Sequence, residues 1–568
     1  MNLAELVEGQ PFLRLTGAVE TEVSGLTHDS RRAKPGMVFF CLSGRRHDGR
    51  DFAAEAVARG AIAVVAETPP PSLPPSVTCL LISDPRRSFA LAAAAWWRYP
   101  ATRLRFLAVT GTNGKTTVNH LVENILRRDG RRVGLIGTVE NHLGGRKTVA
   151  GLTTPDAWET QAGLGAMVAA GLTHACVEVS SHGLAGHRLA GCAVDAAVLT
   201  NVARDHLDFH ENVETYARTK LSLFQGLGQV MGSGGGWRAP VAGVKSGPVY
   251  AVLNSDDAFF ESFRMRTAGP YLAYGVVRPS HVRLLGAVLE ARGSLVRVAF
   301  LPRPRDLPAA DWVTPAAGWP REASLRFPHP GRHNVSNLLA ALTVAWAEGC
   351  RWEGVRQAAE TFPGVSGRWE LVASPDGVTG VVDFAHNPGG LVRALETARL
   401  ATRRRVILVF GCEGRKDRGK RPVMGAIASR LADHVVLTTD NTFGEDARQI
   451  LRDIESGLID GTAAGSCLGG IPSWDAADSI LGRSGRRRAT YEIVQDRREA
   501  ICRAADVAGS GDLVVVAGRG HDAKLVFGSN VEILDDREVL ERALADVCRT
   551  RHSHSIVAGG AGGFTPTR

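Results

Sequence analysis

The chain has 568 residues and is 44% hydrophobic, which predicts three or four domains with packed cores. Its net charge of +9 is spread along the chain, which suits anionic small molecules such as nucleotides. A nucleic-acid binder is disfavoured, because no basic stripe is interleaved with aromatic residues. The nine cysteines show neither metal-ligand nor disulfide spacing, and no leader sequence or membrane-spanning segment is evident, so we expect a cytoplasmic protein without a membrane anchor.

Residues 1–100 have the pattern of a small α/β unit. Apolar runs predict strands over 37–42, 61–66 and 78–82, and a helix over 52–59 lies between the first two. Five prolines between positions 69 and 75 mark a surface loop.

A second unit, 101–361, alternates short apolar strands with helices. The strands are expected over 104–110, 132–137, 174–179 and 193–200, and each ends in a polar loop. This order predicts a mostly parallel sheet with its functional groups at the carboxyl ends of the strands. The glycine-rich stretch 231–247 lacks periodicity and is interpreted as a surface insertion.

A third unit spans 362–548. Its predicted strands cover 380–383, 405–410, 434–439 and 513–517, and the polar, glycine-rich stretch 460–490 is interpreted as a second insertion. We expect the tail 549–568 to be disordered.

The most informative motif runs from Val109 to Thr117, between an apolar strand and a helical pattern. Its glycines allow backbone N–H groups to surround phosphate oxygens at a helix N-terminus; Lys115 can reach the outer phosphates, and Thr116 can hold magnesium. The general nucleotide-binding loop has glycine at the position of Val109, whereas this chain has Gly111 two residues later, so a tight turn followed by an ordinary lysine is the alternative. The helix is supported by an apolar face made of Val118, Leu121, Val122, Ile125 and Leu126, ahead of Gly130.

Two polar clusters follow predicted strands of the central unit. Glu178 and Ser180 follow the strand at 174–179, and His206 follows the next one. A carboxylate and an imidazole at neighbouring strand ends can hold a metal beside nucleotide phosphates. Alternatively, Glu178 caps a helix and His206 is an ordinary loop residue, while Lys220, taken alone, fits a solvated helix position. Asn337 begins the helical pattern 338–347 and is interpreted as its cap.

Taken in order, these motifs resemble the Mur ligase family from about residue 20 to 545. The matching segments are Asp29–Arg31, Asp48–Gly49, Gly111–Thr117, Thr153–Pro155, Glu178–His182, Arg204–Asp208, the Lys220 region, Gly331–Asn337, Gly367–Arg368, Asp383–Pro388, Phe410–Arg421 and Ala517–Asp522. The resemblance implies an N-terminal UDP-sugar-binding domain (1–100), a central P-loop ATPase (101–361) and a C-terminal Rossmann-like domain (362–548).

Within the family, Thr153-Thr154-Pro155 and the first domain favour the branch that adds the third amino acid of the peptidoglycan stem. The implied reaction joins an amino acid to UDP-N-acetylmuramoyl-L-Ala-D-Glu through an acyl phosphate. The implied cofactors are ATP and Mg²⁺, the partners are the UDP-dipeptide and the amino acid, and the molecule is expected to be a monomer.

The resemblance also assigns roles to single residues. The residues that the resemblance implies for ATP binding are Gly111, Thr112, Asn113, Gly114, Lys115, Thr116, Thr117, Asn334 and Arg368. The catalytic set is Lys115, Glu178, His206, Lys220 and Asp383, and the metal set is Thr116, Glu178, His206 and Lys220, the last as a carbamate. The UDP-sugar-peptide contacts are Ser30, Thr153, Thr154, Ser180 and Arg188, and the amino-acid contacts are Lys416, Asp440, Asn441, Gly518 and Asp522.

The departures from the family concern the incoming amino acid. Ligases for meso-diaminopimelate carry Asp-Asn-Pro-Arg where this chain has Asp440-Asn441-Thr442-Phe443, and Lys416 stands where an arginine is usual. Phenylalanine cannot pair with a carboxylate, and lysine lacks the guanidinium fork. Gly186 also replaces a glutamine. These changes argue against diaminopimelate and favour lysine, ornithine or another amino acid, with Asp440 and Asp522 available to a side-chain amine.

Two other functions stay open. The altered pocket also fits a related ligase recruited to a different substrate, and a non-catalytic nucleotide-binding module is the third hypothesis.

Overall fold

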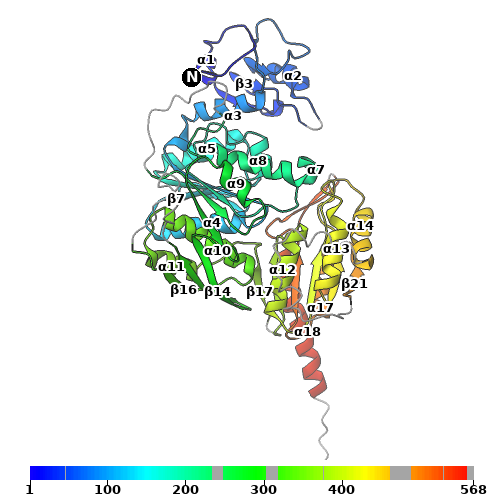
Figure 1. The fold of residues 1–568 in the computed structure, drawn as a ribbon. Coiled ribbons are helices and arrows are strands. Elements are labelled where there is room, and N and C mark those ends of the chain that lie inside the picture. Colours follow the sequence, from blue (N-terminus) through cyan, green and yellow to red (C-terminus); the bar gives the residue numbers. More distant parts are fainter. Residues whose placement is uncertain are drawn as a thin grey trace, which may run out of the picture.

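The computed structural model describes residues 1–44, 47–232, 247–301, 318–374, 376–460, 488–528 and 530–559. It contains three α/β units, with the C-terminal unit beside the central one and the N-terminal unit at the far end (Figure 1). The predicted class, α/β with three domains, is confirmed. Over the described ranges, no helix combines the length and apolar character that crossing a bilayer requires.

The first unit is a five-stranded sheet in which only the edge strand β1 is antiparallel. In spatial order its strands are β1 (Arg14–Thr16), β5 (Thr78–Leu81), β4 (Ala63–Ala66), β3 (Met37–Phe40) and β2 (Gly25–Thr27). Its helices are α1 (Leu3–Leu6), α2 (Ala53–Ala58) and α3 (Pro85–Trp96), with short 3-10 turns at Ser30–Arg32, Gly49–Phe52 and Pro100–Thr102. The three predicted strands and the predicted helix are confirmed, whereas β1 and β2 were too short to be predicted.

The central unit has an eleven-stranded mixed sheet. In spatial order its strands are β16 (Glu322–Phe327), β15 (Gly293–Phe300), β14 (Val282–Glu290), β13 (Tyr271–Gly275), β12 (Tyr250–Asn254), β11 (Ala196–Leu199), β6 (Arg105–Thr110), β10 (His174–Val179), β7 (Val133–Ile136), β8 (Glu140–His142) and β9 (Lys147–Val149). The six strands from β13 to β7 are parallel, and antiparallel hairpins extend the sheet at both ends.

Apolar cores cover both faces of this sheet. One face packs on α4 (Lys115–Arg128), α10 (Arg332–Ala347) and α11 (Trp352–Glu360). The other packs on α5 (Ala157–Ala169), α8 (Val213–Gln225) and α9 (Phe260–Arg266), with the short helices α6 (Ser181–Ala185) and α7 (Leu207–His210) near the strand ends. The four predicted strands are β6, β7, β10 and β11, and the predicted apolar face of α4 is buried. The strands between 250 and 327 were missed, although β12 is a fully buried run; β14 and β16 carry many partly or fully exposed residues, which weakens their apolar pattern.

The third unit is a six-stranded sheet, parallel except for its edge strand β17. In spatial order its strands are β17 (Glu370–Ala373), β18 (Thr379–Asp383), β22 (Leu513–Ala517), β19 (Val406–Phe410), β20 (His434–Leu437) and β21 (Thr490–Ile493), and β23 (Lys524–Phe527) pairs with β24 (Asn530–Ile533). Its helices are α12 (Pro388–Ala401), α13 (Lys420–Leu431), α14 (Ala447–Asp460), α17 (Arg497–Val507) and α18 (Asp536–Gly559). All four predicted strands are present.

Most of the two predicted insertions, 231–247 and 460–490, lies outside the described residues. The tail expected to be disordered from 549 begins inside α18, which continues to Gly559, so its first part is helical; 560–568 lie outside the described residues. The helix starts on residues packed against the third sheet, such as Leu540 and Leu544, and simply continues beyond them.

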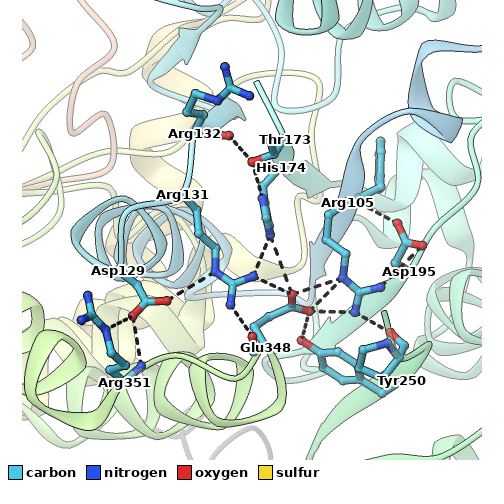
Figure 2. Close-up of polar contacts among 12 residues, drawn as sticks. Arg105, Asp129, Arg131, Arg132, Thr173, His174, Asp195, Tyr250, Glu348 and Arg351 are labelled. Atoms are coloured by element: carbon cyan, nitrogen blue, oxygen red, sulfur yellow. Dashed lines mark hydrogen bonds and ion pairs between the residues drawn. The ribbon is translucent and has the colours of Figure 1, made fainter. Parts of the chain in front are cut away.

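A buried network of charges joins the amino ends of the central strands, opposite the phosphate loop (Figure 2). Glu348, just after α10, accepts a hydrogen bond from Arg105 at 2.8 Å and one from the Tyr250 hydroxyl at 2.7 Å. Arg131 and His174 reach the same carboxylate at 3.9 Å each. The Arg105 and Glu348 side chains are 8% and 3% exposed, so removing one partner leaves a charge buried without compensation.

We therefore expect Glu348→Ala to lower the free energy of unfolding by roughly 3–5 kcal/mol. Urea unfolding followed by circular dichroism measures this. The matched control is Glu290→Ala, which removes an exposed pair with Arg326 in the same unit and should cost at most about 1 kcal/mol. Equal effects of the two substitutions would contradict this account.

Candidate active site

The phosphate loop connects β6 to α4, and two glycines in it have conformations and surroundings that exclude a side chain. Gly111 has φ +146°, and a Cβ there would lie 1.9 Å from the Thr200 hydroxyl. Gly114 has φ +86°, and its Cβ would lie 2.4 Å from Asn337 Oδ1. Asn337 is therefore not the cap predicted for a helix at 338–347. It lies inside α10, which starts at Arg332, and it packs against the phosphate loop.

Two lysines, the half-buried Lys115 and the buried Lys220, converge on one backbone carbonyl of this loop. The Lys115 amine donates to the carbonyl oxygens of Gly111 at 3.0 Å and Thr112 at 2.9 Å, and the Lys220 amine donates to Gly111 at 3.0 Å. Burial lowers the pKa of Lys115. Burial, reinforced by the neighbouring Lys115 charge, lowers the pKa of Lys220 well below its ordinary value. Lys220 is only 1% exposed, so the solvated position considered from the sequence is wrong.

Glu178 is fully buried at the end of β10 and faces the first turn of α4. The Thr116 hydroxyl donates to its carboxylate at 3.0 Å, and Thr138 donates through both its backbone N–H, at 2.9 Å, and its hydroxyl, at 2.8 Å. The alternative that Glu178 caps a helix is wrong, because the Ser180 side chain caps α6 instead.

A second buried carboxylate, Asp205, follows β11 on the other side of the loop. It accepts a hydrogen bond from Asn387 at 2.9 Å and lies 3.7–3.8 Å from the imidazoles of His386 and His206. Burial opposes ionisation, but the neighbouring His386 and the Lys420 charge hold the pKa of Asp205 well below its ordinary value. Burial lowers the pKa of His206 to about 3, so its imidazole is neutral at pH 7 and can serve as a ligand.

The third unit contributes residues that touch the phosphate loop directly. Arg368 donates to the Thr116 hydroxyl at 3.1 Å, and its guanidinium carbon lies 4.2 Å from the centre of the Phe384 ring. The side chains of Asn387 and Asn113 form a hydrogen bond at 3.2 Å. Asp383 accepts the Trp369 backbone N–H at 2.7 Å, and burial raises the pKa of this carboxyl group.

These elements enclose a cavity of about 950 Å³ between the central and third units. The predicted site residues in its lining are Thr112, Asn113, Gly114, Lys115, Thr116, Thr117, Thr153, Ser180, His206, Asn334, Arg368, Asp383, Asp440, Asn441, Gly518 and Asp522. Glu178 and Lys220 lie just behind this lining, since they contact Thr116 and Gly111.

The residues expected to bind the UDP-substrate divide into two groups. Thr154 connects Glu178 to Arg188, because it donates to the Glu178 carbonyl at 2.8 Å while its own carbonyl accepts Arg188 at 2.6 Å. The hydroxyl groups of Thr153 and Thr138 form a hydrogen bond at 3.1 Å. Ser30 belongs to the first unit, where it donates to Glu55 at 2.8 Å, and it is not part of the cavity lining.

Most, but not all, of the residues expected to bind the amino acid line the cavity. Asp440, Asn441, Gly518 and Asp522 line the cavity, whereas Lys416 is half-buried in the loop after β19 and does not. A residue absent from the sequence prediction, Arg519, completes this wall.

Thr116 and Glu178 present the oxygen ligands that Mg²⁺ prefers, so the donor set fits a magnesium ion. His206 follows β11 and Glu178 lies in β10, so the two residues come from the strands on either side of β6. The Lys115 charge lowers the pKa of His206, and the Glu178 charge raises that of Lys115. Within the described ranges, no group of three or more His, Cys, Asp or Glu side chains is placed to hold a metal ion.

Family models match the chain in three consecutive parts: the Mur ligase family catalytic domain over 22–95, the Mur ligase middle domain over 109–345, and the Mur ligase glutamate ligase domain over 367–520. The UDP-N-acetylmuramoyl-L-alanyl-D-glutamate–2,6-diaminopimelate ligase of Geobacillus thermodenitrificans is 36% identical over 96% of this chain and 100% of its own length. The chain belongs to the Mur ligase family.

Other relatives agree. The Listeria monocytogenes ligase of the same name is 34% identical over 94% of this chain and 97% of its own length. A solved structure of a ligase with that activity covers 97% of this chain and 99% of its own, with a TM-score of 0.60 and 27% identity. An Acinetobacter baumannii ligase that acts on the diaminopimelate-containing product shares the fold, with a TM-score of 0.55 and 16% identity.

Several site residues were missed as individuals. Asp205 and Asn387 lie within segments singled out from the sequence, but their contact connects two domains and has no local signal. Thr138 also follows a predicted strand, β7, and a search of every strand end for hydroxyl groups would have found it. Arg519 follows Gly518, yet nothing local distinguishes it from an exposed arginine.

The neutral state of His206 predicts the direction of a pH effect on stability. Its folded pKa of about 3 lies below the ordinary histidine value of about 6.5, so the unfolded chain binds more protons between these limits. The stability that His206 contributes is complete above pH 6.5 and is lost as the pH falls towards 3. We expect the thermal unfolding midpoint to drop between pH 7 and pH 5, and to drop less in His206→Asn. An equal or larger drop in the variant would contradict the low pKa.

Proposed function

We propose that the protein is an ATP-dependent ligase that adds the third amino acid to UDP-N-acetylmuramoyl-L-Ala-D-Glu in peptidoglycan synthesis. The observation that carries this proposal is the convergence of Lys115 and the buried Lys220 on one carbonyl of the loop between β6 and α4, with the buried Glu178 carboxylate beside it. The names and full-length coverage of the relatives support the same substrate pair.

The chemistry requires two anions to meet. The γ-phosphoryl group of ATP passes to the D-glutamyl carboxylate, the P–O bond to ADP breaks, and an acyl phosphate forms. The incoming amine attacks its carbonyl carbon, loses a proton, and inorganic phosphate leaves. Lys115 and Arg368 line the cavity beside the phosphate loop and would oppose the repulsion between phosphate and carboxylate.

Thr116 and Glu178, with His206 and a modified Lys220, are the residues that would hold Mg²⁺. The ion would neutralise phosphate charge in the transition state. The protein contributes the fixed positions: Thr138 and Thr116 orient the Glu178 carboxylate, and Asp205 orients the imidazole of His386 and the amide of Asn387.

Lys220 is suited to carbamylation because only a neutral amine reacts with carbon dioxide. Its burial and its Lys115 neighbour disfavour the ammonium form. The amine and carbon dioxide would give a carbamate and one proton, which converts a cation into an anion next to Lys115. This would add an anionic group to the metal set, and it would relieve the repulsion between the two ammonium groups.

The activity is tested by measuring phosphate release from ATP with UDP-N-acetylmuramoyl-L-Ala-D-Glu and a panel of amino acids. We expect release that depends on the UDP-dipeptide and on at least one amino acid of the panel. Release with a different acceptor only would favour the recruited ligase, and no release with any acceptor would favour a non-catalytic module; either result contradicts the proposal.

The carbamate role predicts that Lys220→Ala lowers turnover at least about 100-fold and that millimolar formate or acetate restores part of it, because a free carboxylate can take the vacated place. The matched control is Lys147→Ala, which removes an exposed lysine paired with Glu140 and should leave turnover unchanged. Normal activity of Lys220→Ala, or a loss that carboxylates never relieve in a folded variant, would contradict the role.

A further inference from the structure

The cavity wall that the third unit forms carries a buried arginine with an unsatisfied hydrogen-bond donor. Arg519, in the loop after β22, is 2% exposed and lines the cavity. Its Nη2 donates to the Asp522 carbonyl at 2.7 Å, but Nη1 reaches Asn441 only at 3.4 Å and Asp440 at 3.7 Å. Its Nε has no hydrogen-bond partner in the described part of the chain. A guanidinium gains most from a carboxylate that accepts two parallel hydrogen bonds, which no protein group supplies here.

Two glycines bring this arginine to the cavity. A Cβ at Gly411, after β19, would lie 2.3 Å from the Thr438 carbonyl, so the loop after β20 can cross the end of β19 only at glycine. Asp440, three residues after the end of β20, then meets Gly518, where a Cβ would lie 3.2 Å from Asp440 Oδ2 and where φ is +113°. The loops after β20 and β22 therefore share one wall.

The charges on this wall define what it can bind. The loops after β19, β20 and β22 contribute the carboxylates of Glu413, Asp440 and Asp522 to the cavity lining, and among their described residues Arg519 is the one cation that lines it. A guanidinium flanked by carboxylates complements a head group that carries both a carboxylate and an ammonium. Phe443, at the position where the sequence raised doubt about diaminopimelate, is 36% exposed and does not line the cavity.

We propose that Arg519 binds a carboxylate of the incoming amino acid that is remote from the reacting amine, so that the enzyme selects a diamino acid with two carboxylates. The missing arginine at 443 is thus replaced by a cation from the neighbouring loop. This inference rests on the proposed function, and it revises the expectation of lysine or ornithine.

The test compares two substrates: diaminopimelate, and an analogue in which the carboxylate remote from the reacting amine is a carboxamide. In the wild-type protein we expect kcat/KM to be about 100-fold lower for the amide, since a buried guanidinium loses its charged partner. In Arg519→Met we expect kcat/KM for diaminopimelate to fall by a similar factor while the amide changes less than about threefold. The KM values for ATP and the UDP-dipeptide should stay the same.

Two further variants make the result decisive. Lys524→Met removes an exposed cation five residues further along, outside the cavity lining, and should change neither substrate. Arg519→Lys keeps the charge without the fork and should give an intermediate acid-to-amide ratio; if Arg519→Met does not fold, as judged by its unfolding midpoint, this ratio alone carries the test. An equal loss for both substrates, or no loss, overturns the role of Arg519. A wild-type protein that turns over no amino acid overturns the proposed function instead.

Discussion

Positive charge held away from water at a single carbonyl oxygen is the constraint on which this site depends. The amines of Lys115 and Lys220 both lie 3.0 Å from the Gly111 carbonyl; Lys220 is buried there, whereas Lys115 is half-buried and lines the cavity. Such an arrangement is unfavourable until an anion arrives or one amine loses its charge. In the proposed mechanism, a triphosphate beside Lys115 and a carbamate on Lys220 would meet these two needs at once.

The third unit completes the site because its loops rest on the same phosphate loop. Arg368 contacts Thr116, Asn387 bridges Asn113 and Asp205, and His521 lies 3.2 Å from the Thr138 carbonyl. These contacts are polar and few, so ligand atoms can replace them one by one as substrates bind. In the proposed reaction, the walls that the two units form around the cavity would limit the access of water to the acyl phosphate, which water would otherwise hydrolyse.

The sequence predicted well those features that depend on residues close to one another along the chain. The strand–loop–helix order around Gly111–Thr117, the apolar face of α4 and the strand that carries Glu178 follow from short-range pattern, and all three are present in the structure. Asn337 was misjudged because a polar residue before an apolar run fits a cap, whereas its position is fixed by contact with Gly114. The burial of Lys220 had no local signal, since its helix position reads as solvated until Tyr216 and the phosphate loop cover it.

The amino-acid pocket shows why residue-by-residue comparison of one loop can mislead. Strands β20 and β22 are not neighbours in the sheet, because β19 lies between them, yet their following loops meet where Gly411 and Gly518 carry no side chains. A cation lost from the first loop can therefore be replaced from the second without moving either strand. The replacement preserves the charge at the wall while changing the sequence position that provides it, so recognition is a property of the wall and not of any one motif.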